Sequence, residues 1–450
     1  MGLGLRTAQP SYPVAEHLFL ILLSGQFLQF FLSFIFSFAS SRLISPEEIG
    51  SWSQAFFGIK IYASLTDFSL ETAAFEATPE ANNLSSQAPQ QCHFSVLFWF
   101  RFFTSLAPLI IVILLRCLLG TVKLYFFLAA LFFFFDRVGN LLKIALDKNF
   151  AQATAIKWEL GSFIGSNFLL FFLGGLGVGG VLFSVQQICE KMFLLLGMLW
   201  YRGTIFNLEK FTFGSCFFSA HLRNLLKKYA FPALSGIFAN VFIYDFLPFF
   251  LSISVSSHAA GLFAKAFSLA CLPLLITTVF NRITTPLYGY HMHNLARCKS
   301  IFLQSQILKV VVLLPGIFFL QQTANLWLPL LLGARWHGVI PIYRILAVYA
   351  FCRSFYDDLG SLISLGLGQP SMMAKNQLFH AAMVVLSLPL LFYCKSVLLA
   401  AGFCSLCMLL ACARLWYYLF EVLQITAKDI WANIINLKNR GVGFVGKTIS

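Results

Sequence analysis

The chain has 450 residues, of which 59% are hydrophobic and only 11% are charged, and it carries a formal net charge of +14. Soluble domains contain about 25% charged residues, so this chain lacks the polar surface that a water-soluble enzyme needs. The composition therefore predicts an all-α polytopic membrane protein.

Segments of about 20 mostly apolar residues, long enough to cross a bilayer as a helix, recur along the chain. The twelve predicted spans lie at 14–38, 49–72, 94–116, 123–147, 155–173, 178–201, 228–253, 259–281, 301–320, 339–366, 376–394 and 397–420. The first span is too long for the hydrophobic part of a signal peptide and lacks a following cleavage site, so we expect a spanning helix there. The pattern does not define exact boundaries, especially within 155–201.

The distribution of Lys and Arg between the loops predicts the orientation of these spans. With both termini in the cytoplasm, sixteen Lys and Arg residues fall on the cytoplasmic side and five on the outer side, as the positive-inside rule requires. The positive charge is thus explained by topology, and no nucleic-acid partner is expected. We predict a six-helix half at 1–201, a cytoplasmic linker at 202–227, a second six-helix half at 228–420 and a cytoplasmic tail at 421–450.

The two halves share a weak internal repeat. At an offset of 211 residues, 23–56 aligns without gaps to 234–267 with eleven identities, which include the pair Gly50 and Gly261. Further matches are LLGTVK (118–123) with LLGARW (331–336) and FFDRVGNL (134–141) with FYDDLGSL (355–362). The copies are six spans apart, so the repeat predicts two parallel halves, a plan found in transporters whose substrate site lies between them. Chance similarity in a biased composition is the alternative.

The stretch LLLGARW (330–336) is interpreted as an outer turn before the tenth span. We therefore expect Arg335 and His337 at the membrane interface and Trp336 in an aromatic belt. Pro341 fits the first turn of the following helix, where its missing N–H costs little.

Ten basic residues fall within the predicted spans, where a charge costs several kcal/mol unless it is paired, reaches the interface or lines a wet cavity. Lys143, Lys191 and Arg414 lie near helix ends or acids, so pairing or snorkelling explains them. The candidate substrate contacts are Lys60, Arg101, Lys265, Arg344 and Arg353. Arginine presents a planar fork to phosphate and lysine a mobile point charge, so this set favours a hydrated cavity for an anionic substrate. The alternative is ion pairing with acids in the spans, namely Asp67, Glu71, Asp245 and Asp358.

The repeat also aligns Asp136 with Asp357, and each is followed three residues later by a glycine. A carboxylate in the middle of the membrane can carry a coupling ion, so both aspartates are ion-coupling candidates. Each could equally hold its helix in place through hydrogen bonds.

Several catalytic and metal-binding patterns do not occur. There is no P-loop motif, so the chain is not itself an ATP-driven pump. HMH (291–293) has no third ligand in its loop, and the eleven cysteines are scattered through mostly apolar segments, so neither a metal nor a cofactor is expected. No outer loop is long enough for the catalytic region of a membrane glycosyltransferase. We therefore predict a protein without enzymatic activity.

Three stretches carry a combination of motifs. SRLISPEEIGSWSQAFFGIKIYASLTDFSLETAAF (41–75) has a Ser-Pro-Glu-Glu-Ile-Gly turn, a helix and then Asp67, and LPLLLGARWHGVIPIYRILAVYAF (328–351) has a Gly-x-x-Trp and a Pro-x-x-Arg-Ile-Leu-Ala pattern. LGLGQPSMMAKNQL (365–378) has a Leu-Gly-Gln-Pro turn. Together they resemble the polysaccharide-biosynthesis flippases, of the O-antigen transporter type, in the multidrug/oligosaccharidyl-lipid/polysaccharide (MOP) exporter superfamily. Ser69 stands where that family usually has glycine.

The resemblance implies a MATE-like fold of about twelve transmembrane helices in two parallel halves. It also implies an inner-membrane transporter that moves an undecaprenyl-pyrophosphate-linked oligosaccharide to the outer leaflet for surface polysaccharide or lipopolysaccharide assembly. Lys60, Lys265, Arg344 and Arg353, together with Arg101, would contact the head group, while the polyprenyl tail stays in lipid. The expected partners are this lipid-linked oligosaccharide, membrane lipids and the polysaccharide polymerase machinery.

Three other functions remain open from the sequence. A drug or metabolite antiporter of the same superfamily would favour an acidic cavity. A lipid II flippase would need additional spans that the polar segment 421–450 does not supply. A non-transporting scaffold for envelope assembly would need neither cavity charge nor a repeat.

Overall fold

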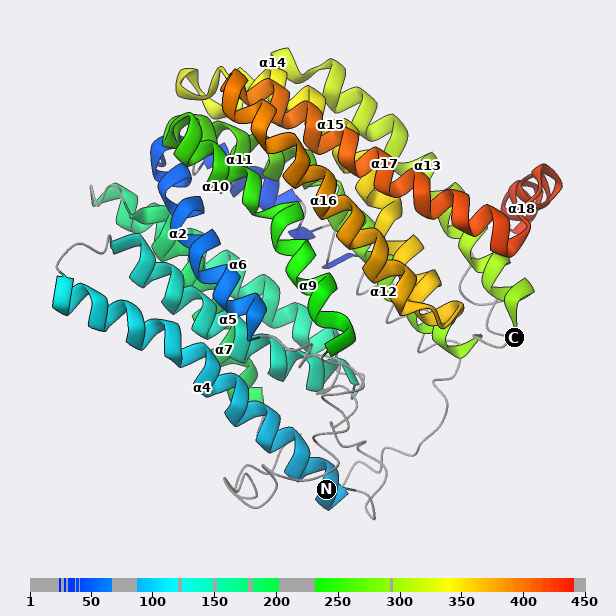
Figure 1. Ribbon diagram of the computed structural model, residues 1–450, viewed down its shortest axis with the longest axis horizontal. Helices are drawn as coiled ribbons and strands as arrows, with labels where there is room; N and C mark the ends of the chain where they lie inside the picture. Colours follow the sequence, from blue (N-terminus) through cyan, green and yellow to red (C-terminus); the bar gives the residue numbers. More distant parts are fainter. Residues whose placement is uncertain are drawn as a thin grey trace. The chain divides into compact units, whose positions relative to one another are not determined.

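The computed structural model describes residues 46–66, 87–119, 124–148, 152–176, 181–201, 231–291 and 294–440, with short stretches between 24 and 45. Every regular element in this part of the chain is helical (Figure 1). Among the described helices, seven are long and apolar enough to cross a membrane, and they lie between Phe98 and Leu423.

The first half contributes five long described helices. They are α2 (Pro46–Leu65), α4 (Gln87–Leu119), α5 (Leu124–Lys148), α6 (Gln152–Gly175) and α7 (Leu182–Tyr201). They coincide with the predicted spans from 49–72 to 178–201. The predicted span 14–38 lies largely outside the described residues, as do Asp67, Ser69 and Glu71.

The second half is divided more finely than the hydropathy pattern predicts. Its helices are α9 (Phe231–Tyr244), α10 (Phe246–Ser254), α11 (Ser257–Cys271), α12 (Leu274–Tyr290), α13 (Leu295–Gln322), α14 (Ala324–Leu332), α15 (Val339–Ser361) with a π-helical turn (Leu362–Gly366), α16 (Pro370–Cys394), α17 (Val397–Leu423) and α18 (Ala427–Arg440). The predicted span 228–253 is interrupted at Asp245. The next predicted span, 259–281, is interrupted at Pro273, whose ring removes a backbone donor. Two further helices, α14 and α18, occupy segments predicted as loop and tail.

The described helices form two compact units, and each is considered by itself. The first comprises residues 1–11 and 51–241, and the second comprises residues 12–50 and 242–450. Consequently α2 begins in the second unit and continues in the first, whereas α9 begins in the first and ends in the second.

The core of the first unit is aromatic. Trp52 of α2 and Phe132 and Phe133 of α5 are buried against each other and against α7. The Trp52 and Phe132 rings meet edge to face at 6.1 Å, and the rings of Phe56 and Phe133 lie 4.8 Å apart. Edge-to-face and offset ring pairs of this kind add to the stabilisation from buried area, so phenylalanine holds α2 against α5.

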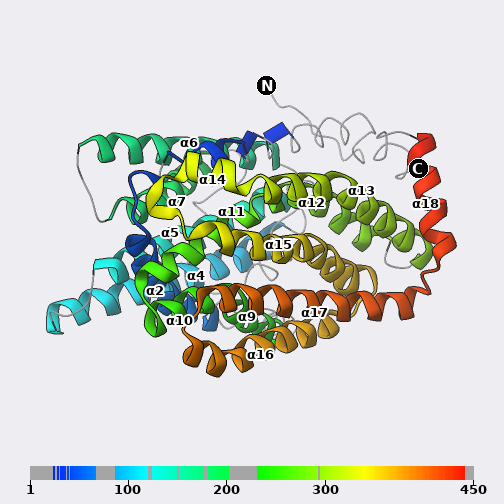
Figure 2. The ribbon, with the colours of Figure 1, turned by 90° about the horizontal axis from the view of Figure 1, so that it is seen from above.

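Helix α15 lies at the centre of the second unit. It packs against α11, α12, α13 and α17 (Figure 2). Pro341 lies in its first turn, as predicted, and its far end passes through the π-helical turn into the Leu-Gly-Gln-Pro motif. There Gly368 has φ +64°, which favours glycine, and Pro370 starts α16 at a position that needs no N–H donor.

Within the second unit, the start of α2 crosses the start of α11. A Cβ atom added to Gly50 would overlap the carbonyl oxygen of Ser257, and one added to Gly261 would overlap the carbonyl oxygen of Pro46. Pro46 and Ser257 are equivalent at the repeat offset of 211 residues, as are the two glycines. Each helix therefore places its glycine on the first residue of the other, and we call this contact the glycine crossing.

Polar contacts around the glycine crossing follow the same repeat. The equivalent residues Ser45 and Ser256 each accept a hydrogen bond from a backbone N–H three residues ahead, at 3.2 and 3.1 Å. Glu47 Oε1 lies 2.6 Å from Nδ1 of its equivalent residue, His258. This hydrogen bond holds the pKa of the Glu47 carboxyl below its ordinary value.

An ion pair and a hydrogen bond hold helix α18 against the start of α13. Lys299 Nζ lies 2.8 Å from Asp429 Oδ2, and Gln304 donates a 2.9 Å hydrogen bond to the side chain of Asn433. The hydrogen bond from Lys299, followed by those from Thr426, lowers the pKa of Asp429. Trp431 is exposed on this helix, while Asn433 is buried against α13.

Candidate functional site

The first ion-coupling candidate, Asp136 on α5, is paired with a lysine. Lys191 Nζ of α7 lies 3.0 Å from Asp136 Oδ1, and Asn140 donates a 3.2 Å hydrogen bond to the other carboxylate oxygen. Lys143 forms an ion pair with Glu159. The expectation that pairing explains Lys143 and Lys191 is therefore confirmed.

Arg137, next to Asp136 in the sequence, faces a different helix. Its guanidinium donates a 2.9 Å hydrogen bond to the Thr66 hydroxyl and a second one to the carbonyl oxygen of Ala63. Arg137 is buried, so it joins α5 to the last turn of α2.

Two of the predicted substrate contacts belong to the first unit. Lys60 on α2 is half-buried, and its Nζ lies 5.4 Å from the centroid of the Phe56 ring, within cation–π range. Arg101 on α4 is only 2% exposed. Arg101 is thus inside the unit, whereas Lys60 is partly accessible.

Lys265 on α11 lies beside a tryptophan that the sequence analysis misplaced. Its side chain is 7% exposed, with Nζ 5.7 Å from the Trp336 ring. Trp336 is itself buried and donates a 2.9 Å hydrogen bond to the carbonyl oxygen of Ser41. The prediction that Trp336 anchors in an aromatic belt is therefore wrong, because a local turn directs its ring inward, while the neighbouring Arg335 and His337 are exposed.

The two predicted arginines of α15 lie on opposite faces of that helix. Nine residues separate Arg344 from Arg353, which is about two and a half turns and about 14 Å along the axis. Arg344 is half-buried on the side of exposed Val348, and its side chain forms no ion pair with any described residue. The structure therefore does not bring these two arginines to one point.

Arg353 lies between two tyrosines, in a group that we call the Arg353 cluster and define as Tyr244, Arg353, Tyr356 and Asp357. The Arg353 guanidinium carbon is 4.4 Å from the centroid of the Tyr244 ring of α9 and 5.6 Å from that of Tyr356. Its Nη2 lies 2.9 Å from Asp357 Oδ1, and the Asp357 side chain is 43% exposed. The buried Tyr356 hydroxyl accepts a hydrogen bond from Asn376.

This combination of groups suits a phosphorylated sugar. A guanidinium between aromatic rings keeps a fixed orientation and still has donors for phosphate oxygens. Aromatic faces provide apolar contact area, and a partly exposed carboxylate accepts hydrogen bonds from hydroxyl groups. The second ion-coupling candidate, Asp357, thus lies in a potential binding cluster.

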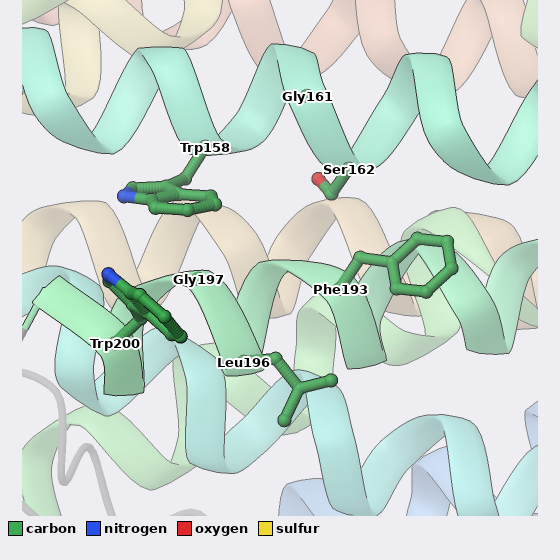
Figure 3. Close-up of a pocket in the computed structure, with 7 residues that line it drawn as sticks. All are labelled: Trp158, Gly161, Ser162, Phe193, Leu196, Gly197 and Trp200. Atoms are coloured by element: carbon green, nitrogen blue, oxygen red, sulfur yellow. The ribbon is translucent and has the colours of Figure 1, made fainter.

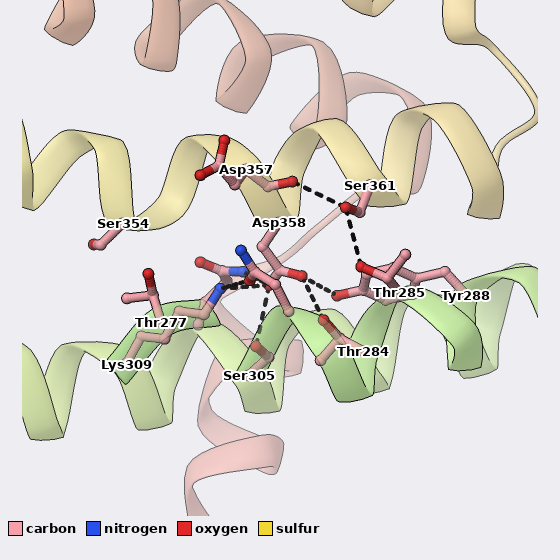
Figure 4. Close-up of polar contacts among 12 residues, drawn as sticks. Thr277, Thr284, Thr285, Tyr288, Ser305, Lys309, Ser354, Asp357, Asp358 and Ser361 are labelled. Carbon is pink, nitrogen blue, oxygen red and sulfur yellow. Dashed lines mark hydrogen bonds and ion pairs between the residues drawn. The ribbon is translucent and has the colours of Figure 1, made fainter. Parts of the chain in front are cut away.

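The neighbouring carboxylate, Asp358, is at the centre of a buried polar network that joins α12, α13 and α15 (Figure 4). We define the Asp358 network as Asn281, Thr284, Tyr288, Ser305, Gln306, Lys309 and Asp358. Lys309 Nζ lies 3.1 Å from Asp358 Oδ2, and both side chains are 0% exposed.

From the sequence, Asp358 is predicted only as a possible ion-pair partner, and Lys309 is not among the predicted substrate contacts. One signal was available in the sequence. Residues adjacent on a helix point about 100° apart, so Asp357 and Asp358 could not share one environment. What the sequence lacks is the partner helix, because the α12 and α13 residues of the network lie some 50 to 75 positions away.

A separate pocket of about 400 Å³ lies between α6 and α7 in the first unit (Figure 3). Its lining residues are Trp158, Gly161, Ser162, Phe193, Leu196, Gly197 and Trp200. None of them is charged, and none is a predicted site residue. The pocket therefore suits an apolar chain rather than a phosphate.

The fold is that of MOP superfamily transporters. Similar solved structures include an inward-facing multidrug MATE transporter (TM-score 0.61, 13% identity, 87% of this chain and 96% of that one) and a MOP transporter from Pyrococcus furiosus (0.59, 15%, 91% and 96%). The lipid II flippase MurJ is also similar (0.53, 14%, 92% and 90%). The chain thus has a multi-span, MATE-like helical fold.

The sequence itself identifies the family of the chain. The family described as polysaccharide biosynthesis protein matches residues 40–341, more than half of the chain, so the chain belongs to that family. It is also 23% identical over 110 residues to the lipopolysaccharide biosynthesis protein WzxC of Escherichia coli (strain K12). That match covers 24% of this chain and 22% of WzxC, about a fifth of the relative's length. The chain is therefore a member of the polysaccharide biosynthesis protein family with the fold of MOP superfamily transporters, as expected from the sequence.

Proposed function

We propose that the protein is a flippase that moves a polyprenyl-pyrophosphate-linked oligosaccharide from the cytoplasmic to the outer leaflet of the bacterial inner membrane. Its family membership and transporter fold support this proposal, as does the local similarity to WzxC. The glycan would then enter surface polysaccharide or lipopolysaccharide assembly, with the polymerase machinery as the next partner.

The observation that carries the proposal is the Arg353 cluster. It combines a cation with two tyrosine rings and a partly exposed carboxylate. A lipid-linked oligosaccharide has both a phosphate group for the guanidinium and sugar rings for the tyrosines. Asp357 holds the Arg353 side chain along α15, and a substrate phosphate would compete for the same donors.

The remaining basic candidates would act as further contacts during the movement of the head group. Lys60 and Arg101 belong to the first unit, and Lys265 and Arg344 to the second. In the proposed cycle the six-helix halves at 1–201 and 228–420, joined by the linker 202–227, alternate between two states biased by the substrate. The polyprenyl tail stays in lipid, and both termini and the 421–450 tail lie in the cytoplasm.

The proposal is tested by removing the charge of Arg353 and measuring translocation of a lipid-linked oligosaccharide in proteoliposomes. We expect Arg353→Gln to reduce the rate about tenfold, the effect of losing one charge-assisted hydrogen bond. Arg353→Lys should recover only part of it, because lysine lacks the planar fork. Arg414→Gln is the matched control, since Arg414 also stacks on an aromatic ring, Phe379, but lies outside the candidate set.

A normally folded Arg353→Gln protein with the wild-type rate would exclude the Arg353 cluster from head-group binding. The wider cationic site is tested by alanine at Lys60, Lys265, Arg344 and Arg353 together. If that variant still translocates substrate, the cationic-site idea is wrong.

The drug-antiporter alternative makes a different prediction in cells. Asp136 and Asp358 are both paired with lysines, which leaves them poorly suited to bind a cationic drug. Loss of a flippase should cause lipid-linked oligosaccharide to accumulate in the inner leaflet. Loss of an antiporter should change drug tolerance, and loss of a scaffold should do neither.

A further inference from the structure

The Asp358 network encloses one carboxylate with oxygen-bearing side chains from two neighbouring helices. Thr284 and Tyr288 of α12 donate hydrogen bonds to Asp358 Oδ1 at 2.8 and 3.1 Å. Ser305 of α13 donates to Oδ2 at 3.1 Å, and Gln306 donates through its amide nitrogen to the same oxygen. The network is closed to solvent, because Asp358 and Lys309 are both fully buried.

Lys309 provides the positive charge of this network. Its ammonium lies 3.1 Å from Asp358 Oδ2 and donates a 2.9 Å hydrogen bond to Asn281 Oδ1. A buried carboxylate requires a compensating charge, since removing one partner of a buried ion pair leaves the other charge unpaired and strongly destabilises the fold. Two further titratable groups near Asp358 are Tyr288, which is hydrogen-bonded to it, and Asp357, which is directed to Arg353.

The network also contains a carbonyl oxygen that none of its described neighbours uses. Gln306 Oε1 is buried and has no hydrogen-bond partner among the described residues, although its own amide nitrogen is bonded to Asp358. Together with the Asp358 carboxylate, the Asn281 amide and the hydroxyls of Ser305 and Thr284, this carbonyl gives a set of oxygen ligands. Hard cations prefer oxygen ligands of these types.

We propose that the Asp358 network is a site for a small monovalent cation such as sodium, and that the ammonium of Lys309 occupies the position of that cation in the native protein. Because the ammonium is tethered to α13, the charge of Asp358 is balanced without an ion from solution. It follows that the native protein needs no sodium at this position. A chain without the lysine would expose an oxygen-lined anionic site that a free cation can enter.

The test removes the tethered charge and asks whether sodium replaces it. Lys309→Met keeps most of the side-chain volume and leaves Asp358 without a cation. The apparent melting temperature of the purified full-length protein is measured in sodium chloride and in choline chloride at equal ionic strength. We expect sodium to raise the value by several degrees in Lys309→Met, in a concentration-dependent manner, and to leave the wild-type value unchanged.

The matched control is the neutral pair Lys309→Met with Asp358→Asn, which removes both charges and should not respond to sodium. An equal response to sodium in the wild type, or no response in Lys309→Met, would overturn the proposal. The proposal would also be overturned if the stability of Lys309→Met depended on pH and not on sodium, because a proton alone would then replace the lost ammonium charge. If Lys309→Met does not fold at any sodium concentration while the neutral pair folds, sodium cannot occupy the site. Lys309→Gln, alone and combined with Asp358→Asn, provides a second pair of variants for which the same responses to sodium are expected.

Discussion

Asp357 and Asp358 are adjacent on α15 and yet differ completely in their surroundings. Asp357 is 43% exposed and paired with Arg353 one turn back on the same helix. Asp358 is fully buried and bonded to groups from α12 and α13. A turn of about 100° per residue is enough to separate a solvent-accessible carboxylate from a buried one, so the two should respond very differently to the same substitution.

We predict that Asp358→Asn strongly destabilises the protein and that Asp357→Asn does not. Asp358→Asn leaves the buried Lys309 ammonium without its counter-charge, which costs about 3–5 kcal/mol. Asp357→Asn removes a partly exposed pair on one helix, worth about 0.3–0.5 kcal/mol. Thermal unfolding in detergent, followed by circular dichroism, compares the two. Equal losses of stability would contradict the structure of the Asp358 network.

At the scale of the helix, the glycine crossing predicts where side-chain volume is not tolerated. Gly261→Ala should destabilise the second unit by several kcal/mol or displace α11, because its new methyl group would overlap the backbone carbonyl of Pro46. Gly402→Ala in α17 is the control, since an added Cβ there meets nothing within 4 Å. Alanine in an exposed helix position stabilises by up to about 1 kcal/mol relative to glycine. The apparent melting temperatures of the two variants should therefore change in opposite directions.

The same pair of helix starts contains a pH-dependent contact. Since the Glu47 carboxyl has a lowered pKa in the folded protein, its contribution to stability is present above the ordinary value of 4.5 and is lost as the pH falls through the lowered value. The pair is about half exposed, so its contribution is at most about 1 kcal/mol. Glu47→Gln should therefore be slightly less stable than wild type at about pH 6, and the difference should disappear well below pH 4.5. A difference that grows on acidification would contradict this.

For the whole molecule, the proposed orientation predicts which positions can be labelled from outside the cell. In a variant whose native cysteines are replaced, a single cysteine in place of exposed Arg335 or Lys395 should react with a membrane-impermeant maleimide in intact cells. A cysteine in place of Lys428, on α18, should react only after the membrane is permeabilised. Fluorescence of a reporter fused to the C-terminus provides an independent measurement, because the reporter folds in the cytoplasm. The reverse labelling pattern would exclude the proposed topology.

Hydropathy predicted the long helices well, because four spans of the second half lie within α13, α15 with its π-helical turn, α16 and α17. It did not predict the break at Asp245 or the separate helix α14, since average hydropathy is insensitive to a change of direction within an apolar segment. The amphipathic helix α18 was likewise interpreted as a plain tail. These three features were not predicted for the same reason, because each feature depends on what the helix contacts rather than on its composition.

The candidate site was predicted in part. Spacing alone could have placed Arg344 and Arg353 on opposite faces of one helix, but no spacing reveals that Tyr244 lies against Arg353. Nor could the sequence show that Lys309 reaches Asp358, 49 residues further along the chain. The types of residue were readable from the sequence, whereas their partners required the tertiary structure.

The glycine crossing has a consequence for how the two halves can diverge. Gly50 and Gly261 each lie against the helix start that the other half contributes, so one contact imposes the same requirement on two copies of the motif. A side chain at either glycine would disturb a contact that both copies form. A change within one copy alone could not compensate for it. Selection on this single self-complementary contact would thus keep two otherwise drifting segments alike, so the resemblance between the halves persists where they meet.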